Sequence, residues 1–233
     1  MTWYDDLDFA ENPFTIKPRE DFDEFIGHKN LVRNVLATIE GRKNILIRGR
    51  YGTGKTSVLK SLIKAHKGKG KVFYYNAFAS NKKIDFEDVL KNAGGLFSRA
   101  LGMKTKDMVV LLDEAQNLDE ENLLEIEDYH SRGFFKSIIL VTSEINFKFP
   151  TSVMRLIDEE HTIPMFSESE AIAVVRNRLV DEHALLPEDI IKEIYSLSSS
   201  PRDFLQKCDD VCRSAVSRRA DKAAKKDLKS IEN

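Results

Sequence analysis

Short apolar segments recur along the first two thirds of the chain, and segments whose apolar residues have helical spacing separate them. The apolar segments are four to eight residues long, as strands buried on both faces of a sheet usually are. We expect five strands, at residues 44–47, 71–78, 108–115, 137–143 and 161–165. We expect helices at residues 30–40, 56–65, 85–101, 120–130 and 152–157. This alternation predicts an α/β fold of three layers around a five-stranded parallel sheet.

The pattern changes after residue 166, where the strand-like segments stop. The sequence Ser-Glu-Ser-Glu at 167–170 is a capping box that opens a helix to about residue 180. Pro187 and Pro201 mark the starts of two more helices. These signals predict a small unit that contains helices alone.

We therefore divide the chain into an α/β core at 1–166, a helical unit at 167–219 and a basic tail at 220–233. The first 20 residues of the core should be irregular, because Pro13 and Pro18 interrupt any helix there. The tail has too few large apolar residues to build another core.

Composition narrows the class of protein without naming it. The chain has 36 basic and 38 acidic residues, so its net charge of −2 does not by itself mark a nucleic-acid-binding protein. The stretch Arg218–Lys229 is the one local feature that suggests nucleic acid. It is interpreted either as a DNA contact or as a solvated helix face or frayed terminus. No apolar stretch is long enough to span a membrane, and the acidic, aromatic N-terminus does not resemble a targeting signal, so we expect a soluble, cytoplasmic protein. Cys208 and Cys212 lie one helical turn apart, and the histidines lack metal-ligand spacing, so neither a disulfide framework nor a zinc site is expected.

A glycine-rich segment follows the first predicted strand and matches the pattern GxxxxGK[ST] that binds phosphate groups. The expected nucleotide-binding residues are Gly49, Arg50, Tyr51, Gly52, Thr53, Gly54, Lys55 and Thr56. Glycines allow backbone N–H groups to point at phosphates, and the next helix adds the positive end of its dipole. Lys55 should reach the β- and γ-phosphates of ATP, and the Thr56 hydroxyl should bind Mg²⁺.

Two acidic residues end the third predicted strand, about 60 positions after the glycine-rich segment. Four apolar residues precede Asp113, so a buried strand should deliver its carboxylate to the edge of the sheet, where it can hold Mg²⁺. Glu114 follows directly and suits the general base that orients an attacking water molecule.

Further polar residues have weaker signals. Ser143 ends the fourth predicted strand, where a polar side chain can contact the γ-phosphate or the water, and Thr142 and Asn146 are its alternatives. Arg155 and Arg202 are either solvated surface arginines or groups that neutralise charge on a transferred phosphoryl group.

Together these motifs resemble the AAA+ ATPases, over residues from 12 to about 220. Within that superfamily the chain is similar to the initiator-type clade, which includes archaeal origin-recognition ATPases and the short ExeA-like and transposition ATPases. The closer likeness rests on three segments, Asn12-Pro13-Phe14, Phe25-Ile26-Gly27-His28 and Tyr75-Asn76. Two departures stand out, since the chain has no length for a winged-helix domain after residue 219 and little room for the extra helix that marks initiators.

The resemblance implies roles for individual residues. Ile26 and Gly27 would lie against the adenine. Ser143 would occupy the sensor 1 position, where the family usually has asparagine. Arg155 would be an arginine finger that acts in a neighbouring subunit's site, and Arg202 would be the sensor 2 arginine.

The leading hypothesis is an ATP-hydrolysing protein that works as a homo-oligomer, with ATP at the subunit interface, on duplex DNA or a DNA-bound protein. A clamp-loader-like subunit is an alternative, although Arg155 lacks the Ser-Arg-Cys context of that group. A nucleotide-binding adaptor that does not hydrolyse ATP is another, which the presence of Glu114 disfavours.

Overall fold

The chain forms two compact units. The computed structural model describes residues 2–16, 29–68, 70–79, 83–94, 103–179 and 185–231. The first unit, the α/β unit, spans Lys29–Tyr51 and Lys55–Ile163. The second, the helical unit, combines the N-terminal residues, Gly52–Gly54 and the chain from Pro164 onward.

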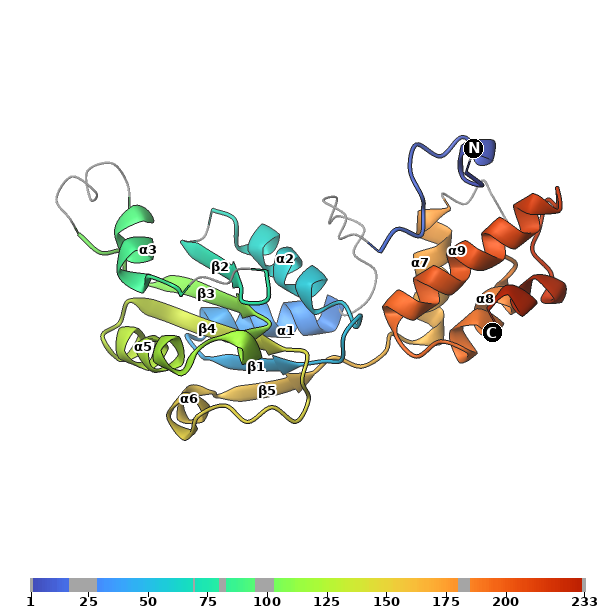
Figure 1. The fold of residues 1–233 in the computed structure, drawn as a ribbon. Coiled ribbons are helices and arrows are strands. Elements are labelled where there is room, and N and C mark those ends of the chain that lie inside the picture. The colour runs from blue at the N-terminus through green and yellow to red at the C-terminus, as the bar shows by residue number, and fades with distance from the viewer. Residues whose placement is uncertain are drawn as a thin grey trace. The chain divides into compact units, whose positions relative to one another are not determined.

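A five-stranded sheet forms the centre of the α/β unit (Figure 1). Its strands are β1 (Ile45–Arg48), β2 (Val72–Asn76), β3 (Met108–Asp113), β4 (Phe135–Thr142) and β5 (Glu159–Thr162). All neighbouring strands are parallel, in the order β2-β3-β4-β1-β5. The predicted five-stranded parallel sheet is therefore confirmed. Because β4 lies between β1 and β3, the segments that follow these three strands meet at one edge of the sheet.

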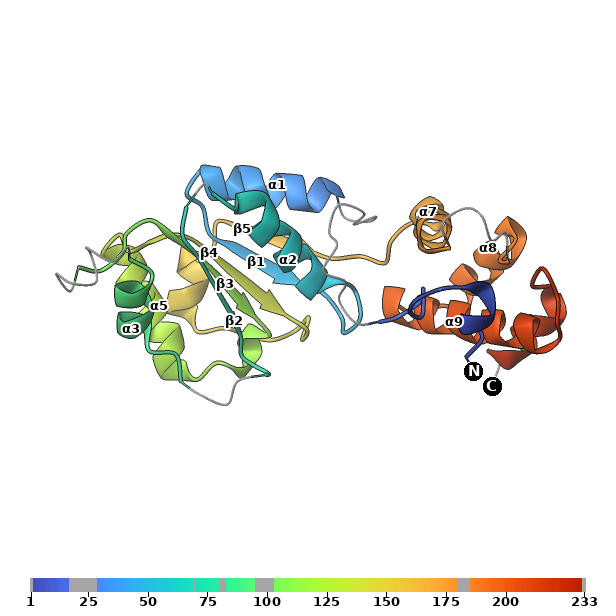
Figure 2. The ribbon, with the colours of Figure 1, turned by 90° about the horizontal axis from the view of Figure 1, so that it is seen from above.

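Helices cover both faces of this sheet (Figure 2). One layer contains α1 (Lys29–Glu40) and α2 (Lys55–His66), and the other contains α3 (Phe86–Asn92), α5 (Glu120–Ser131) and α6 (Thr151–Leu156). Alternate strand residues supply each face, since side chains on a strand point to opposite sides in turn. Val110, Leu112 and Leu140 pack in one apolar cluster with residues of α3, α5 and α6. The three layers follow from strands that are apolar on both faces.

Strand β5 differs from its predicted position at residues 161–165. The structure pairs Glu159–Thr162 with β1, so the strand begins two residues earlier. An edge strand carries charged side chains at no burial cost, and its sequence therefore lacks the apolar run that marks the central strands. The predicted helix at 85–101 is seen as α3, and residues 95–102 lie outside the described part of the chain.

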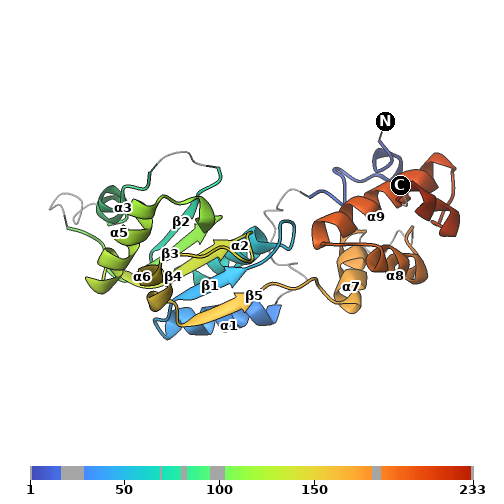
Figure 3. The same ribbon diagram turned by 60° about the horizontal axis from the view of Figure 1, so that its bottom comes forward.

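The helical unit contains α7 (Glu168–Arg178), α8 (Glu188–Ser196), α9 (Pro201–Ser217) and the 3₁₀ helix η3 (Lys225–Ser230) (Figure 3). The capping box at Ser167 and Glu170 forms as its sequence predicts. Cys208 and Cys212 are unpaired and buried on α9, and burial raises the pKa of both thiols. None of the helices in the described ranges has the length and apolar character needed to cross a bilayer.

The N-terminal segment belongs to the helical unit, although the sequence pattern placed it in the α/β core. Trp3 and Phe14 are buried in the same apolar cluster as α7, α8 and α9. The Trp3 indole N–H donates a hydrogen bond to Asp209 on α9, 2.7 Å away. An irregular segment has no periodicity that indicates its partner, so its packing could not be read from the sequence.

The tail at 220–233 is also part of the helical unit rather than a separate basic extension. Ala223 and Leu228 are buried in the cluster of the helical unit. The Asp227 carboxylate is buried and accepts a hydrogen bond from the Arg218 side chain. These contacts fold the tail back onto α9 through η3, which contacts that helix.

Candidate functional site

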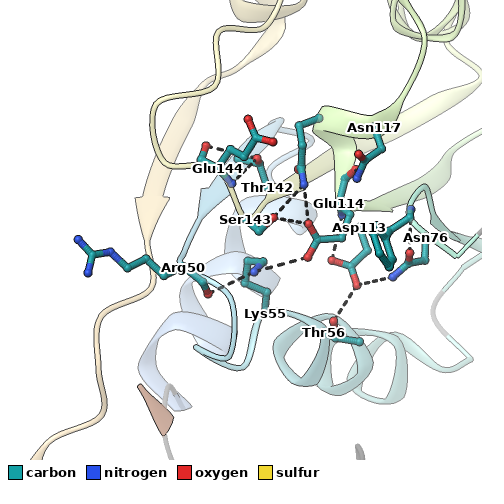
Figure 4. Close-up of polar contacts among 12 residues, drawn as sticks. Arg50, Lys55, Thr56, Asn76, Asp113, Glu114, Asn117, Thr142, Ser143 and Glu144 are labelled. Atoms are coloured by element: carbon teal, nitrogen blue, oxygen red, sulfur yellow. Dashed lines mark hydrogen bonds and ion pairs between the residues drawn. The ribbon is translucent and has the colours of Figure 1, made fainter. Parts of the chain in front are cut away.

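The glycine-rich segment connects β1 to α2, as predicted (Figure 4). Gly52 and Gly54 have φ values of 85° and 93°, a region that residues with a side chain adopt rarely. The Gly49 N–H donates to the Thr142 carbonyl, 3.1 Å away, and so fixes the start of the loop to β4. The Arg50 and Tyr51 side chains are exposed. The loop is thus held at the carboxyl edge of the sheet, next to the first turn of α2.

Lys55 is the first residue of α2, and its side chain is buried. Its ammonium group donates to the Arg50 carbonyl at 3.3 Å and lies 3.6 Å from Oε1 of Glu114. A buried amine is stable when an opposite charge and a carbonyl face it. The amine predicted to reach the phosphates therefore lies beside the carboxylate predicted to orient the attacking water.

The Asp113 carboxylate ends β3 and is fully buried. Its Oδ2 accepts from the Thr56 hydroxyl at 2.8 Å, and from the Tyr74 hydroxyl and the Asn76 amide, each at 3.2 Å. Burial, together with the charge of Glu114, raises the pKa of Asp113, and the hydrogen bond from Thr56 offsets part of that effect. Burial and the Asp113 charge raise the pKa of Tyr74 to about 12.

Glu114 adopts the left-handed conformation, with φ 53° and ψ 44°, between β3 and the 3₁₀ helix η2 (Ala115–Asn117). Non-glycine residues in this region cost conformational energy and often occur at functional sites. Oε2 of Glu114 accepts from the Ser143 hydroxyl at 2.5 Å and from the Gln116 amide at 2.6 Å. The same Gln116 amide donates to the Ser143 oxygen at 2.8 Å. Three side chains thus hold one another in a closed ring.

Three residues of this site were not assigned to it from the sequence: Tyr74, Asn76 and Gln116. Asn76 pairs with Asp113 in the register of β2 and β3, and Tyr74 points the same way because it is two residues earlier. Correct strand order and register would have found both residues. Gln116 carried no signal beyond its position two residues after Glu114.

Ser143 is the predicted strand-end residue that contacts Glu114. Thr142 accepts the Glu144 N–H at 3.1 Å instead, and Asn146 is exposed. Arg155 is exposed on α6, and within the described ranges no hydrogen bond or ion pair holds it. Ile26 and Gly27 lie outside the described residues.

Arg202 belongs to the helical unit, at the start of α9. That unit also includes Gly52–Gly54, and the Arg202 backbone N–H donates to the Gly52 carbonyl at 3.2 Å. A Cβ added at Gly52 would lie 2.9 Å from Cβ of Arg202. Gly52 therefore has both a steric and a conformational reason to be glycine.

No protein-family model matches the chain, and no curated protein matches it. Solved structures do match. The RuvB Holliday junction branch migration motor of Thermotoga maritima has 17% identity and a TM-score of 0.67, over 92% of this chain and 72% of that one. Cdc6p from Pyrobaculum aerophilum has 14% identity and a TM-score of 0.65, over 95% and 70%. Aeropyrum pernix Orc1, solved in complex with DNA, has 16% identity and a TM-score of 0.68, over 95% and 68%.

The chain has the fold of the AAA+ ATPases. The resemblance predicted from the motifs is confirmed at this level. In this AAA+ fold, β4 lies between the strands that carry the glycine-rich loop and Asp113, so Ser143 lies between the two motifs.

Proposed function

We propose that the chain binds ATP with Mg²⁺ and hydrolyses ATP to ADP and phosphate. One observation carries this proposal. Lys55, Thr56, Asp113 and Glu114 come from two segments far apart in the sequence, and their reactive groups converge at one edge of the sheet. A positive charge, two oxygen atoms that suit a metal ion and a candidate base lie there, next to the glycine-rich loop.

The residues present fit an ATP–Mg²⁺ complex. The Thr56 hydroxyl and the Asp113 carboxylate are oxygen donors that lie 2.8 Å apart, and such hard ligands suit Mg²⁺. None of the described residues places a heavy atom within 4 Å of a Cβ added at Gly54, so the Gly54 backbone lies open on that side toward them. Open backbone N–H groups beside a helix N-terminus suit phosphate oxygens. When bound, Mg²⁺ would neutralise charge on the phosphate groups.

Hydrolysis assigns a task to each side chain. Glu114 would accept a hydrogen bond from water and orient its oxygen toward the γ-phosphorus, and the bond to the bridging oxygen of ADP would break as the new bond forms. The water proton would pass through Glu114 to the products. Lys55 would leave its contact with Glu114 for the phosphates and balance the charge there. Ile26 and Gly27 against the adenine, and Arg202 at the nucleotide, complete the proposed site.

The protein would act as a homo-oligomer on duplex DNA or a DNA-bound partner. Arg155 is exposed, and the described residues give it no hydrogen bond or ion pair. This supports the oligomer, because an arginine that completes a neighbour's site must be accessible. The similar RuvB is a Holliday junction branch migration motor, and the similar Orc1 was solved with DNA, which supports the DNA role here.

Steady-state ATP turnover tests the proposal, measured over a range of protein concentrations with and without duplex DNA. We expect the wild type to hydrolyse ATP, and Glu114→Gln to bind ATP without hydrolysing it. The specific activity of the wild type should rise with protein concentration and when DNA is added. Equal turnover by the wild type and Glu114→Gln would remove Glu114 from its role. Activity that is constant with concentration and unaffected by DNA would leave an ATPase without the oligomer and DNA components.

A further inference from the structure

The amide of Gln116 lies at the centre of the contacts that hold Glu114. Its Nε2 atom is 2.6 Å from Oε2 of Glu114 and 2.8 Å from Oγ of Ser143. The Ser143 hydroxyl has one proton and directs it to the same Oε2. One carboxylate oxygen therefore receives two short hydrogen bonds, while the other faces Lys55.

The orientation of the Gln116 amide follows from its neighbours. A carboxylate only accepts hydrogen bonds, so the NH₂ group and not the carbonyl must face Glu114. In this orientation the Gln116 carbonyl oxygen is buried and receives no hydrogen bond from the described residues. A buried acceptor without a hydrogen bond destabilises the fold. The contacts of the Gln116 NH₂ group with Glu114 and Ser143 offset this loss.

The Glu114 backbone is fixed in its left-handed conformation between a strand and a short 3₁₀ helix. Its N–H donates to Oδ1 of Asp113 at 3.1 Å, and its carbonyl accepts from the Asn117 N–H at 3.0 Å. These contacts hold the main chain and leave the direction of the carboxylate to the side chain. A glutamate side chain has three rotatable bonds, and a working base must point one oxygen at the water. The two donors on Oε2 leave Oε1 as the oxygen with room to act.

We propose that Gln116 is a positioning residue for Glu114, and that Ser143 shares this role. The inference rests on the proposed ATP hydrolysis and assigns a further residue to that reaction. Gln116 would act on the reaction through Glu114, whose carboxylate accepts its amide hydrogen bond. The strand-end hydroxyl of Ser143 is then committed to the carboxylate, a different task from direct contact with the γ-phosphate.

The ring can be observed without any nucleotide, because the chain has only two glutamines, Gln116 and Gln206. Labelling glutamine side chains with nitrogen-15 should give two pairs of amide signals. Gln206 is exposed on α9 and serves as the internal control, with Gln206→Met to assign it. We expect the Gln116 pair to exchange slowly with solvent and to shift in Ser143→Ala and Glu114→Ala, while the Gln206 pair stays in place. If the Gln116 amide signals exchange as fast as those of Gln206 and do not shift in either variant, the ring of hydrogen bonds is contradicted.

Kinetics test the positioning role. Gln116→Met keeps the length of the side chain and removes both donors, so we expect kcat to fall about tenfold or more. The KM for ATP should stay within about twofold, because the lost contact does not bind substrate. Ser143→Ala should act in the same direction, and Ser143→Thr, which keeps the hydroxyl, should recover most of the activity. Single-turnover measurements with excess enzyme follow the residual hydrolysis by Glu114→Gln that steady-state turnover does not detect. Adding Gln116→Met should not slow this residual hydrolysis further, since residues that act as a unit are not additive.

The outcomes separate this inference from the function on which it rests. If Glu114→Gln removes turnover while Gln116→Met and Ser143→Ala leave it unchanged, the inference about the role of Gln116 is overturned and the proposed ATP hydrolysis is kept. Losses that multiply in the double variant assign Gln116 a role independent of Glu114 and also overturn it. A wild type that binds ATP but shows no turnover overturns both proposals, whereas Gln206→Met should behave as wild type throughout.

Discussion

The Thr56 hydroxyl donates to Oδ2 of Asp113 across 2.8 Å, although 57 positions separate the two residues. This hydrogen bond brings the start of α2 to the end of β3. Both oxygen atoms lie where a divalent cation would have to bind if the site holds ATP–Mg²⁺. The fold therefore places two oxygen atoms together at the position where the proposed reaction requires Mg²⁺.

We expect Thr56→Ala to raise the Mg²⁺ concentration for half-maximal ATP turnover about tenfold or more, because one oxygen donor is lost. Thr56→Ser keeps the hydroxyl and should stay near the wild type. Ser57→Ala removes a hydroxyl from the next residue and is the matched control. Titration of turnover with Mg²⁺ at saturating ATP measures the shift, and identical curves for Thr56→Ala and wild type would contradict the assigned ligand.

Arg155 allows a test of the subunit interface by mixing two inactive variants. Lys55→Met loses the amine that is proposed to bind phosphate and keeps Arg155, whereas Arg155→Ala does the reverse. If Arg155 acts in a neighbour's site, an equal mixture restores an intact site at about a quarter of interfaces, since each interface joins two different surfaces. We expect turnover in the mixture and almost none in either variant alone. An inactive mixture, with oligomers present by light scattering, would count against action between subunits.

The sequence predicted the α/β core well because its signals are local. Buried strands such as β3 are continuous apolar runs, and the glycine-rich loop has a fixed spacing. The edge strand β5 was displaced by two residues because pairing, not hydrophobicity, defines it. Trp3 and Leu228 pack in the helical unit through contacts between distant segments, which a residue pattern does not encode.

The candidate site was predicted only where its residues belong to local sequence motifs. Lys55 and Asp113 belong to motifs with recognisable neighbours, and the structure brings them to one edge of the sheet. Tyr74 reaches Asp113 only through the register of β2 against β3. Gln116 reaches Glu114 only because Glu114 has a left-handed backbone, which is rare for a residue that is not glycine. Both facts require coordinates.

Asp209 should contribute to the stability of the helical unit by holding the N-terminal segment. It accepts from the Trp3 indole at 2.7 Å and from the Asn12 amide at 2.8 Å. Its other oxygen accepts from the Arg213 guanidinium. We expect Asp209→Ala to lower the free energy of unfolding by about 1–3 kcal/mol, because the Trp3 and Asn12 donors lose their acceptor. Asp210→Ala is the control, because the Asp210 carboxylate also accepts from Arg213 but does not accept from Trp3 or Asn12. Trp3 is the only tryptophan, so its fluorescence during urea unfolding reports on this unit, and equal midpoints for both variants would contradict the prediction.

Asp227 should make the stability of the helical unit depend on pH in the acid range. Burial raises its pKa, but hydrogen bonds from Arg218, Ala224 and Ser214 outweigh burial and hold the pKa below its ordinary value. A carboxyl whose pKa is lower in the folded state stabilises the fold above its unfolded pKa of about 4, and this contribution is lost as the pH falls through the folded pKa. At pH 7 we expect Asp227→Asn to lower the free energy of unfolding by about 2 kcal/mol or more, because a buried charge pair loses one partner.

The difference between wild type and Asp227→Asn should therefore narrow as the pH falls below about 4. Urea unfolding followed by Trp3 fluorescence at pH 7, 4 and 3 measures this difference in the unit that contains both residues. Asp221→Asn changes an exposed aspartate in the same tail and should have little effect at any of these pH values. A difference that stays constant from pH 7 to 3 would mean that the Asp227 charge does not hold the tail, and that its apolar contacts through Leu228 do so alone.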